Sequence, residues 1–432
     1  MEHTTSPVTP DITPDAIVVG GGIGGLGAAL ALSRKGVRVR LLESCKEFGE
    51  VGAGLQIAPN CTRILHEYGL LDEVRALGVR PEGMVMKDAV DATQLTRLDL
   101  GDLERHYGFP YLVIHRSDLH ATLLRACRAA GVELLNNQKV VGYENTARGA
   151  RVLLEDGHTE EAEVVIAADG LHSVARGLVS DDEPVSSAYV AYRAAVPIAQ
   201  VRDHDVSQTD VVVYVGPHCH FVQYPLRGGE MFNQVAVFES PSALAGEEDW
   251  GTPNELGHAF AATCEQVQQG IPLMWRDRWW RMFDRDPIMN WLHGRIALLG
   301  DSAHAPLQYM AQGAVMAIED GWVLAEHVGR QAATRTAGGS GVDWDAALAA
   351  YNAVRPEHCR RVVLTARAWG ELWHLDGLAR EQRNAVLRDR DTRDYSFTDW
   401  VYGPTALVPD DEPEPYRTVP LNDAARGPLL VT

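Results

Sequence analysis

A glycine-rich turn near the start of the chain has the spacing of a pyrophosphate-binding site. Gly20, Gly22 and Gly25 follow an apolar run over 16–19 and open a helical run that ends near Lys35. Gly20 permits a tight turn, Gly22 lets the backbone approach a pyrophosphate, and Gly25 lets the helix pack close to the strand. The N-terminus of that helix offers unpaired N–H groups to phosphates. The turn therefore predicts a bound nucleotide.

Two acidic residues indicate which nucleotide this is. Glu43 ends the next predicted strand, 18 residues after Gly25, where an acid accepts hydrogen bonds from the adenosine ribose and disfavours the 2′-phosphate of NADP. Asp301 follows a buried strand over 295–299, where its carboxylate can hold a ribityl hydroxyl of a flavin. A helix that begins near Gly313 then directs its positive N-terminus at the pyrimidine side of the ring, which would stabilise a reduced, anionic flavin. Together these signatures predict FAD.

The elements that position these residues belong to the α/β class. The order strand, turn, helix, strand and acid predicts a Rossmann-like FAD-binding domain, and strand-like runs in the middle of the chain predict a separate inserted β-sheet that binds substrate. A helical C-terminal region follows. The predicted boundaries are a flexible N-terminus over 1–14, the FAD-binding domain over 15–185 and 290–330, the substrate sheet over 186–289, C-terminal helices over 331–404 and an irregular tail over 405–432.

Composition limits the class of partner. The chain has 432 residues and a net charge of −20, which argues against nucleic acid or anionic membranes as partners. An anionic substrate must therefore be met by local donors. The longest apolar stretch, over 16–32, is interrupted by six glycines and is no membrane span. Six cysteines without CxxC spacing predict reduced, buried thiols in a cytoplasmic protein and no metal site. The polar first fourteen residues do not resemble a signal peptide.

Three motifs, in order, resemble those of the single-component flavoprotein aromatic hydroxylases. They are the glycine turn with Glu43, the segment 168–176 that contains Asp169, and Gly300-Asp301 with the later Gln312-Gly313. The resemblance covers nearly the whole chain. Within this family the chain looks most like the 3-hydroxybenzoate 6-hydroxylases, over the stretches 108–119, 216–230, 306–309 and 369–377.

The resemblance implies a reaction. A nicotinamide coenzyme, NADH or NADPH, would reduce FAD, and O₂ would then form a flavin hydroperoxide that oxygenates a phenol. The implied substrate is 3-hydroxybenzoate and the product 2,5-dihydroxybenzoate. Salicylate, hydroxynicotinate or a natural-product phenol are alternative substrates. Two further alternatives are a flavin-binding redox sensor without turnover and a plain nicotinamide dehydrogenase. The helices around Trp369 and Trp373 make a homodimer conceivable.

A strand over 220–226 supplies the candidate catalytic groups. Alternation places His220, Val222 and Tyr224 on one face, with about 13 Å between the backbones of His220 and Tyr224. His is the natural base near neutral pH, and Tyr could hold the phenol or the carboxylate. From sequence alone such a pair is more often structural. The resemblance favours function and adds Gln308 and Tyr107 to the pocket.

The resemblance also completes the expected cofactor site. To Gly20, Gly22, Gly25, Glu43, Asp301 and Gly313 it adds Val51, Arg116 and Asp169. His304 could either support the flavin loop or take part in catalysis. No arginine is assigned to the substrate carboxylate.

Overall fold

The computed structural model describes residues 13–49, 52–331 and 340–407. Its first layer is a six-stranded sheet in which β1 lies at the centre, parallel to β2 and β11. In sheet order the strands are β17 (Leu292–His293), β18 (Ile296–Leu298), β11 (Val164–Ala167), β1 (Ala16–Val19), β2 (Val39–Leu42) and β7 (Glu133–Leu135). Continuous apolar runs such as Ala-Ile-Val-Val form these strands because helices and loops bury both faces of a parallel sheet. The predicted Rossmann-like fold is confirmed.

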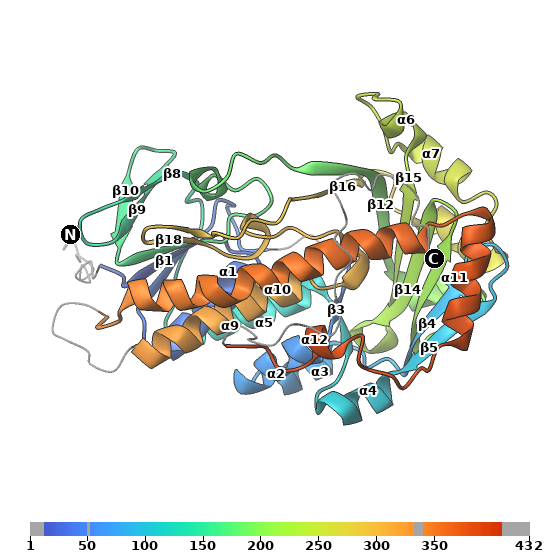
Figure 1. The fold of residues 1–432 in the computed structure, drawn as a ribbon, viewed down its shortest axis with the longest axis horizontal. Coiled ribbons are helices and arrows are strands. Elements are labelled where there is room, and N and C mark those ends of the chain that lie inside the picture. The colour runs from blue at the N-terminus through green and yellow to red at the C-terminus, as the bar shows by residue number, and fades with distance from the viewer. Residues whose placement is uncertain (1–12, 50–51, 332–339, 408–432) are drawn as a thin grey trace, which may run out of the picture.

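Helices cover this sheet and extend beyond it (Figure 1). α1 packs against both α5 and α9, and a Cβ on Gly321 of α9 would lie 2.7 Å from the Ala28 backbone, so these two helices touch through their main chains. α10 runs from this layer to the second sheet. The longer helices are α1 (Ile23–Arg34), α2 (Pro59–Glu67), α3 (Leu71–Leu77), α4 (Leu100–Tyr107), α5 (Arg116–Ala129), α9 (Gly313–Gln331), α10 (Trp344–Trp373) and α11 (Gly377–Asp389), and a short α12 (Asp399–Tyr402) follows.

A seven-stranded sheet forms the second layer. Its strands, in sheet order, are β16 (Trp280–Asp284), β12 (Val185–Pro197), β15 (Met231–Glu239), β14 (Cys219–Leu226), β13 (Asp210–Gly216), β4 (Gly83–Asp88) and β5 (Gln94–Asp99). The four strand-like runs predicted for the middle of the chain correspond to β12 through β15. The sheet is larger than the range 186–289, because β4 pairs in parallel with β13 and brings β5 with it.

The two faces of this second sheet have different covers. α6 (Pro241–Leu244), α7 (Pro253–Ala259) and α8 (Glu265–Gly270) lie toward one face, where residues such as Phe221 and Phe260 form a core. The other face packs against Tyr309 and Trp373, which come from the loop after β18 and from α10. That second face is the one that carries Tyr224.

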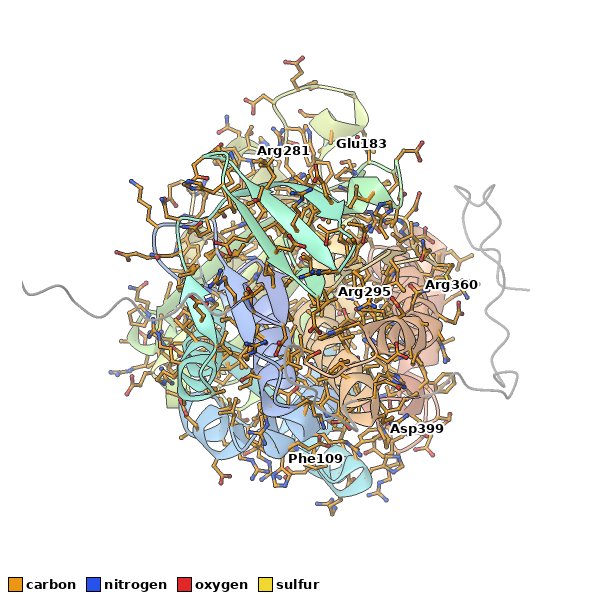
Figure 2. The ribbon with its side chains drawn as sticks, turned by 90° about the vertical axis from the view of Figure 1, so that its left-hand side faces the viewer. Phe109, Glu183, Arg281, Arg295, Arg360 and Asp399 are labelled. Atoms are coloured by element: carbon orange, nitrogen blue, oxygen red, sulfur yellow. The ribbon has the colours of Figure 1, made fainter. Side chains whose placement is uncertain are left out.

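Two small sheets complete the fold. One contains β10 (Thr159–Ala162), β9 (Ala150–Leu154) and β8 (Val140–Asn145), and the other contains β3 (Gly54–Ile57) and β6 (Leu112–His115). Figure 2 views the molecule from the end where the three-stranded sheet lies. In this view Phe109 and Asp399 both lie near the bottom of the molecule. Among the described residues, no helix is long and apolar enough to cross a membrane.

The remaining sequence expectations have mixed outcomes. All six cysteines are free thiols, but Cys45 is exposed, so its predicted burial is wrong. It lies on the loop that leaves β2, beyond the buried strand. The N-terminus over 1–12 and the tail over 408–432 lie outside the described residues, as does Val51.

Candidate active site

The glycine turn has the conformation that a pyrophosphate site requires. Gly20 has φ +107°, and a Cβ there would lie 2.2 Å from the Ala168 carbonyl oxygen. A Cβ on Gly25 would lie 1.9 Å from the Gly20 oxygen, so only glycine allows α1 to start this close to β1. Gly22 caps α1 without a side-chain hydrogen bond. The first N–H groups of the helix are therefore available to an anion.

Glu43 is held at the carboxyl end of β2. One carboxylate oxygen accepts the N–H of Gly21 at 2.6 Å, and the other accepts the N–H of Cys45 at 2.7 Å. Burial alone would raise the pKa of Glu43, but the hydrogen bonds from Cys45 and Gly21 outweigh it and lower the pKa. The carboxylate is thus ionised and lies beside the turn, as an acceptor for ribose hydroxyls must be.

Asp169 and Arg176 connect the second motif to the flavin loop. Asp169 accepts hydrogen bonds on one oxygen from Tyr143 and Val174, while its other oxygen is buried without a partner. Arg176 is buried and donates to the carbonyls of Ser302 and Ala303 at 3.1 and 2.7 Å. A buried carboxylate oxygen normally has a donor. The unpartnered oxygen of Asp169 is therefore an acceptor available to a ligand beside the glycine turn.

Asp301 lies on the turn after β18, and its side chain is exposed. The surrounding protein raises the pKa of its carboxyl group, and the charges of His304 and Arg116 oppose that rise. Arg116 begins α5, where its N–H donates to Ala53, and Gly313 begins α9. The glycine turn and the unpartnered Asp169 oxygen fit a bound FAD.

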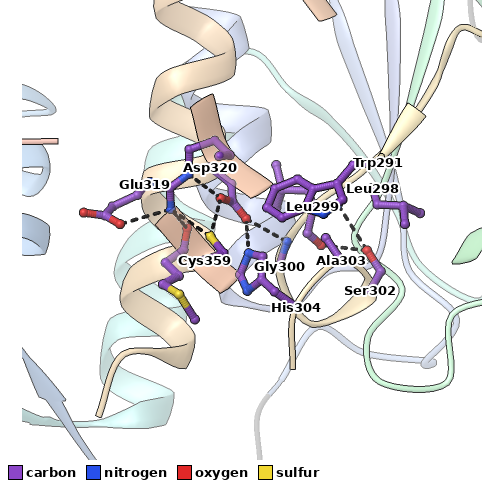
Figure 3. A network of polar contacts seen from close by, with 12 residues as sticks. Trp291, Leu298, Leu299, Gly300, Ser302, Ala303, His304, Glu319, Asp320 and Cys359 are labelled. Atoms are coloured by element: carbon purple, nitrogen blue, oxygen red, sulfur yellow. Dashed lines mark hydrogen bonds and ion pairs between the residues drawn. The ribbon is translucent and has the colours of Figure 1, made fainter. Parts of the chain in front are cut away.

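A buried polar network around Asp320 contacts the turn that carries Asp301 (Figure 3). Asp320 accepts hydrogen bonds from the Gly300 N–H at 3.0 Å, from His304 at 2.6 Å and from Arg355 at 2.8 Å. Burial alone would lower the pKa of His304, but its neighbours Cys359 and Asp320 raise it well above its ordinary value. His304 is therefore an imidazolium with a supporting position. The grouping of His304, Asp320 and Cys359 resembles a metal site, but Arg355 already provides the cation.

His220 lies on β14 and is buried, on the face toward α10. Its Nδ1 lies 2.8 Å from Nε2 of His374, and its ring contacts Tyr309 and Trp373. Burial lowers the pKa of His220 to about 3, far below the ordinary value on which the expectation of a base near neutral pH rested. His220 is thus a neutral imidazole. Its tautomer is coupled to that of His374, since one of the two facing nitrogens must carry the proton.

Tyr224 and Gln308 both lie near Arg193. The Tyr224 ring is buried, and a Cβ on Gly54 would come within 2.4 Å of it, so β3 approaches this strand as closely as glycine permits. Burial raises the pKa of Tyr224, and the charge of Arg193 opposes that rise. Gln308 accepts a hydrogen bond from the same arginine at 3.1 Å. Arg193 thus lies near both Gln308 and Tyr224, and His374 lies beside His220, while the roles of His220, Tyr224 and Gln308 at the substrate stay predictions.

Tyr107 is placed elsewhere. Its hydroxyl contacts Thr398 at 2.8 Å and donates to Asp399 at 2.9 Å, within a separate cluster that contains Tyr402. Its role at the substrate stays a prediction. Tyr111, which sequence reasoning missed, is buried and donates a hydrogen bond to the Gln56 side-chain oxygen at 2.8 Å.

Comparison with known proteins identifies the family. The model of the FAD binding domain family matches residues 13–363. The chain is 37% identical to 3-hydroxybenzoate 6-hydroxylase of Polaromonas naphthalenivorans over 90% of this chain and 95% of that protein. It is 36% identical to 3-amino-4-hydroxybenzoate 2-monooxygenase of Streptomyces cremeus over 91% and 96%.

Solved structures agree. HpxO of Klebsiella pneumoniae, complexed with FAD and uric acid, matches with a TM-score of 0.75 and 27% identity over 87% of this chain and 92% of that one. A salicylate hydroxylase substrate complex matches with a TM-score of 0.72 and 25% identity over 90% and 95%. The glycine turn at Gly20 and these likenesses agree, and the chain belongs to the family of FAD-dependent aromatic hydroxylases.

Proposed function

We propose that this enzyme hydroxylates 3-hydroxybenzoate to 2,5-dihydroxybenzoate. The reaction consumes NAD(P)H, a proton and O₂, and it releases NAD(P)⁺ and water. The observation that carries the proposal is that His220 and Tyr224 share one face of β14 while Gln308 contacts Arg193, within a chain 36–37% identical to three 3-hydroxybenzoate 6-hydroxylases over 90% of its length. The carbon that gains oxygen is para to the phenol, the position that a phenol oxygen activates.

The side chains support this reaction by holding the phenol oxygen and excluding water. Bound FAD would accept the hydride and activate O₂. His220, as a neutral imidazole, can accept the hydrogen bond of the phenol at Nε2 while Nδ1 donates to His374. This hydrogen bond increases electron density on the aromatic ring of the substrate without requiring a free hydroxide ion as base. Tyr224 is the second hydrogen-bonding group on the same strand face.

The remaining expectations belong to the same proposal. The reductant is NADH or NADPH, the protein works in the cytoplasm, and it can form a homodimer through the helical region of Trp369 and Trp373. Parallel assays with the two coenzymes and sedimentation of the purified holoprotein test the first and third of these.

The deciding experiment measures coenzyme oxidation by the yellow holoprotein with and without 3-hydroxybenzoate, and identifies the product by chromatography. We expect strong stimulation and stoichiometric 2,5-dihydroxybenzoate. Stimulation that yields only peroxide would overturn the assigned substrate. In that case 3-amino-4-hydroxybenzoate, salicylate and 6-hydroxynicotinate are tested next, because relatives that act on the first and last are 33–36% identical.

Two variants test the role of His220. His220→Asn should lower turnover about 10- to 100-fold with FAD retained, since a hydrogen bond to a group that gains negative charge contributes about 1.5–3 kcal/mol. His218→Asn is the matched control, because His218 lies two residues away, is exposed and pairs with Glu239 at the surface. Equal losses in both variants, or none in His220→Asn, would refute the role.

A further inference from the structure

Arg193 is on the same face of the second sheet as His220 and Tyr224. It lies on β12 opposite Val235 of β15, and Val235 in turn lies opposite Val222 of β14. Residues directly opposite in antiparallel strands share a face, so Arg193 stands in the row between His220 and Tyr224. Two strand spacings separate the backbones of Arg193 and Val222, which is about 10 Å.

The contacts of Arg193 leave its charge without an acid. Its guanidinium donates to the Gln308 side-chain oxygen at 3.1 Å and lies 5.6 Å from the centre of the Trp280 ring. Among the described carboxylates, none forms an ion pair with it. Burial lowers the pKa of Arg193, the charge of Arg116 lowers it further, and only Tyr224 opposes them.

Arginines that are buried more completely differ in this respect. Arg176 pairs with Asp182 at 2.7 Å, Arg355 pairs with Asp320 at 2.8 Å, and Arg383 lies 3.6 Å from Asp88. Arg193 is partly buried, and a guanidinium shielded from water ordinarily has such a partner, because a desolvated charge without a counter-ion is costly. The guanidinium of Arg193 therefore lacks a counter-ion within the described protein, and a bound anion would supply one.

From this we infer that Arg193 binds the carboxylate of the aromatic substrate. The inference rests on the proposed function and names the group that recognises the acid. Gln308 must present its oxygen to Arg193, since a guanidinium only donates, so the Gln308 amide N–H groups remain for an oxygen of the same ligand. His220 is left to hold the phenol. A carboxylate at Arg193 and a phenol at His220 orient the ring across the sheet face.

The test compares an acid with its neutral amide. In Arg193→Gln, kcat/KM for 3-hydroxybenzoate should fall about 100-fold, mainly through KM, as expected for loss of a buried charged partner. The KM for 3-hydroxybenzamide should change less than about 3-fold. Arg193→Lys should recover part of the loss for the acid, because it restores the charge without the bidentate geometry. Equal effects on acid and amide would overturn the inference.

A matched control excludes a general effect on the sheet. Arg281 lies on the neighbouring strand β16, directly opposite Val190. Val190 belongs to the other face of the sheet, so Arg281 points to that face as well. The guanidinium of Arg281 stacks on the Trp250 ring, 4.6 Å from its centre. Figure 2 shows Arg281 near the upper surface. Arg281→Gln should leave both substrates unchanged.

Failure of the inference and failure of the proposed function are distinguishable. If the wild-type enzyme does not convert 3-hydroxybenzoate, the proposed substrate fails, and the acid–amide comparison is repeated by titrating the flavin spectrum with salicylate and salicylamide. If the wild type converts 3-hydroxybenzoate while Arg193→Gln does so with unchanged KM, only the inference fails. If Arg193→Gln is purified without flavin, Arg193→Lys decides: a KM for the acid equal to that of the wild type supports a charge requirement, and equal rises for acid and amide refute it.

Discussion

Replacing Asp320 by Asn should strongly destabilise the protein, because Asp320 is the centre of the buried network in Figure 3. The carboxylate accepts from Gly300, His304 and Arg355, and the exposed fractions of Asp320, His304 and Arg355 are 0%, 2% and 1%. Asn keeps the shape but removes the charge and one acceptor oxygen. Arg355 then keeps only Glu319 as an acidic partner, and His304 loses the carboxylate that it pairs with. Breaking a buried pair by removing one partner costs about 3–5 kcal/mol, and full burial leaves no solvent to reduce this cost.

Urea unfolding of the holoprotein at pH 7, followed by circular dichroism and flavin absorbance, measures that loss. FAD should also dissociate more readily, because the lost Gly300 N–H bond releases the turn that carries Asp301. Asp345→Asn is the control, since its pair with Arg295 lies at the surface and should contribute less than about 1 kcal/mol. A free energy of unfolding for Asp320→Asn within 1 kcal/mol of wild type would refute the reasoning, since it lies below the roughly 3 kcal/mol expected.

Two further predictions concern the cofactor and pH. Gly25→Ala should yield protein without flavin, since the added Cβ would lie 1.9 Å from the Gly20 oxygen; flavin content per protein after gel filtration measures this, and full occupancy would contradict it. For His220, a folded pKa of about 3 against an ordinary value near 6.5 means that the unfolded state binds the extra proton, so stability is lost as pH falls from about 6.5 toward 3. His220→Asn should remove ~2 kcal/mol of the decrease in unfolding free energy between pH 8 and pH 5, measured by urea titration, and an unchanged pH slope would contradict it.

Local signals predict the cofactor-binding elements well. The signals lie within 30 residues of one another: the run Ala-Ile-Val-Val, the glycines and the acid. Each residue adopts a conformation that suits its type, as Gly20 does with φ +107°. The larger second sheet was only partly predictable. β4 joins it through Val85 opposite Val212, residues that are more than 100 positions apart. No local pattern encodes such a pairing, since the partner strand decides it.

The site was likewise predictable where a local pattern places a residue and unpredictable where distant strands or helices place it. Alternation alone places His220 and Tyr224 on one face of β14, and the structure agrees. Arg193 was missed although it stands within a predicted strand, among small and aromatic residues. Its position at the pocket depends on the register of three strands, which the sequence of one strand does not contain. His374 was missed because it ends α10, about 150 residues after His220.

The charge of the whole molecule explains why one arginine can decide substrate binding. A net charge of −20 repels an aromatic acid, so long-range attraction cannot supply affinity. Salt screens that field over about 8 Å at physiological ionic strength, whereas a pair removed from water is screened far less. Affinity for an anion must therefore come from a short-range contact inside the pocket. Arg193 is suited to it, because its charge faces Tyr224 and Gln308 and no described acid neutralises it. An acid beside Arg193 would remove the preference for a carboxylate at once.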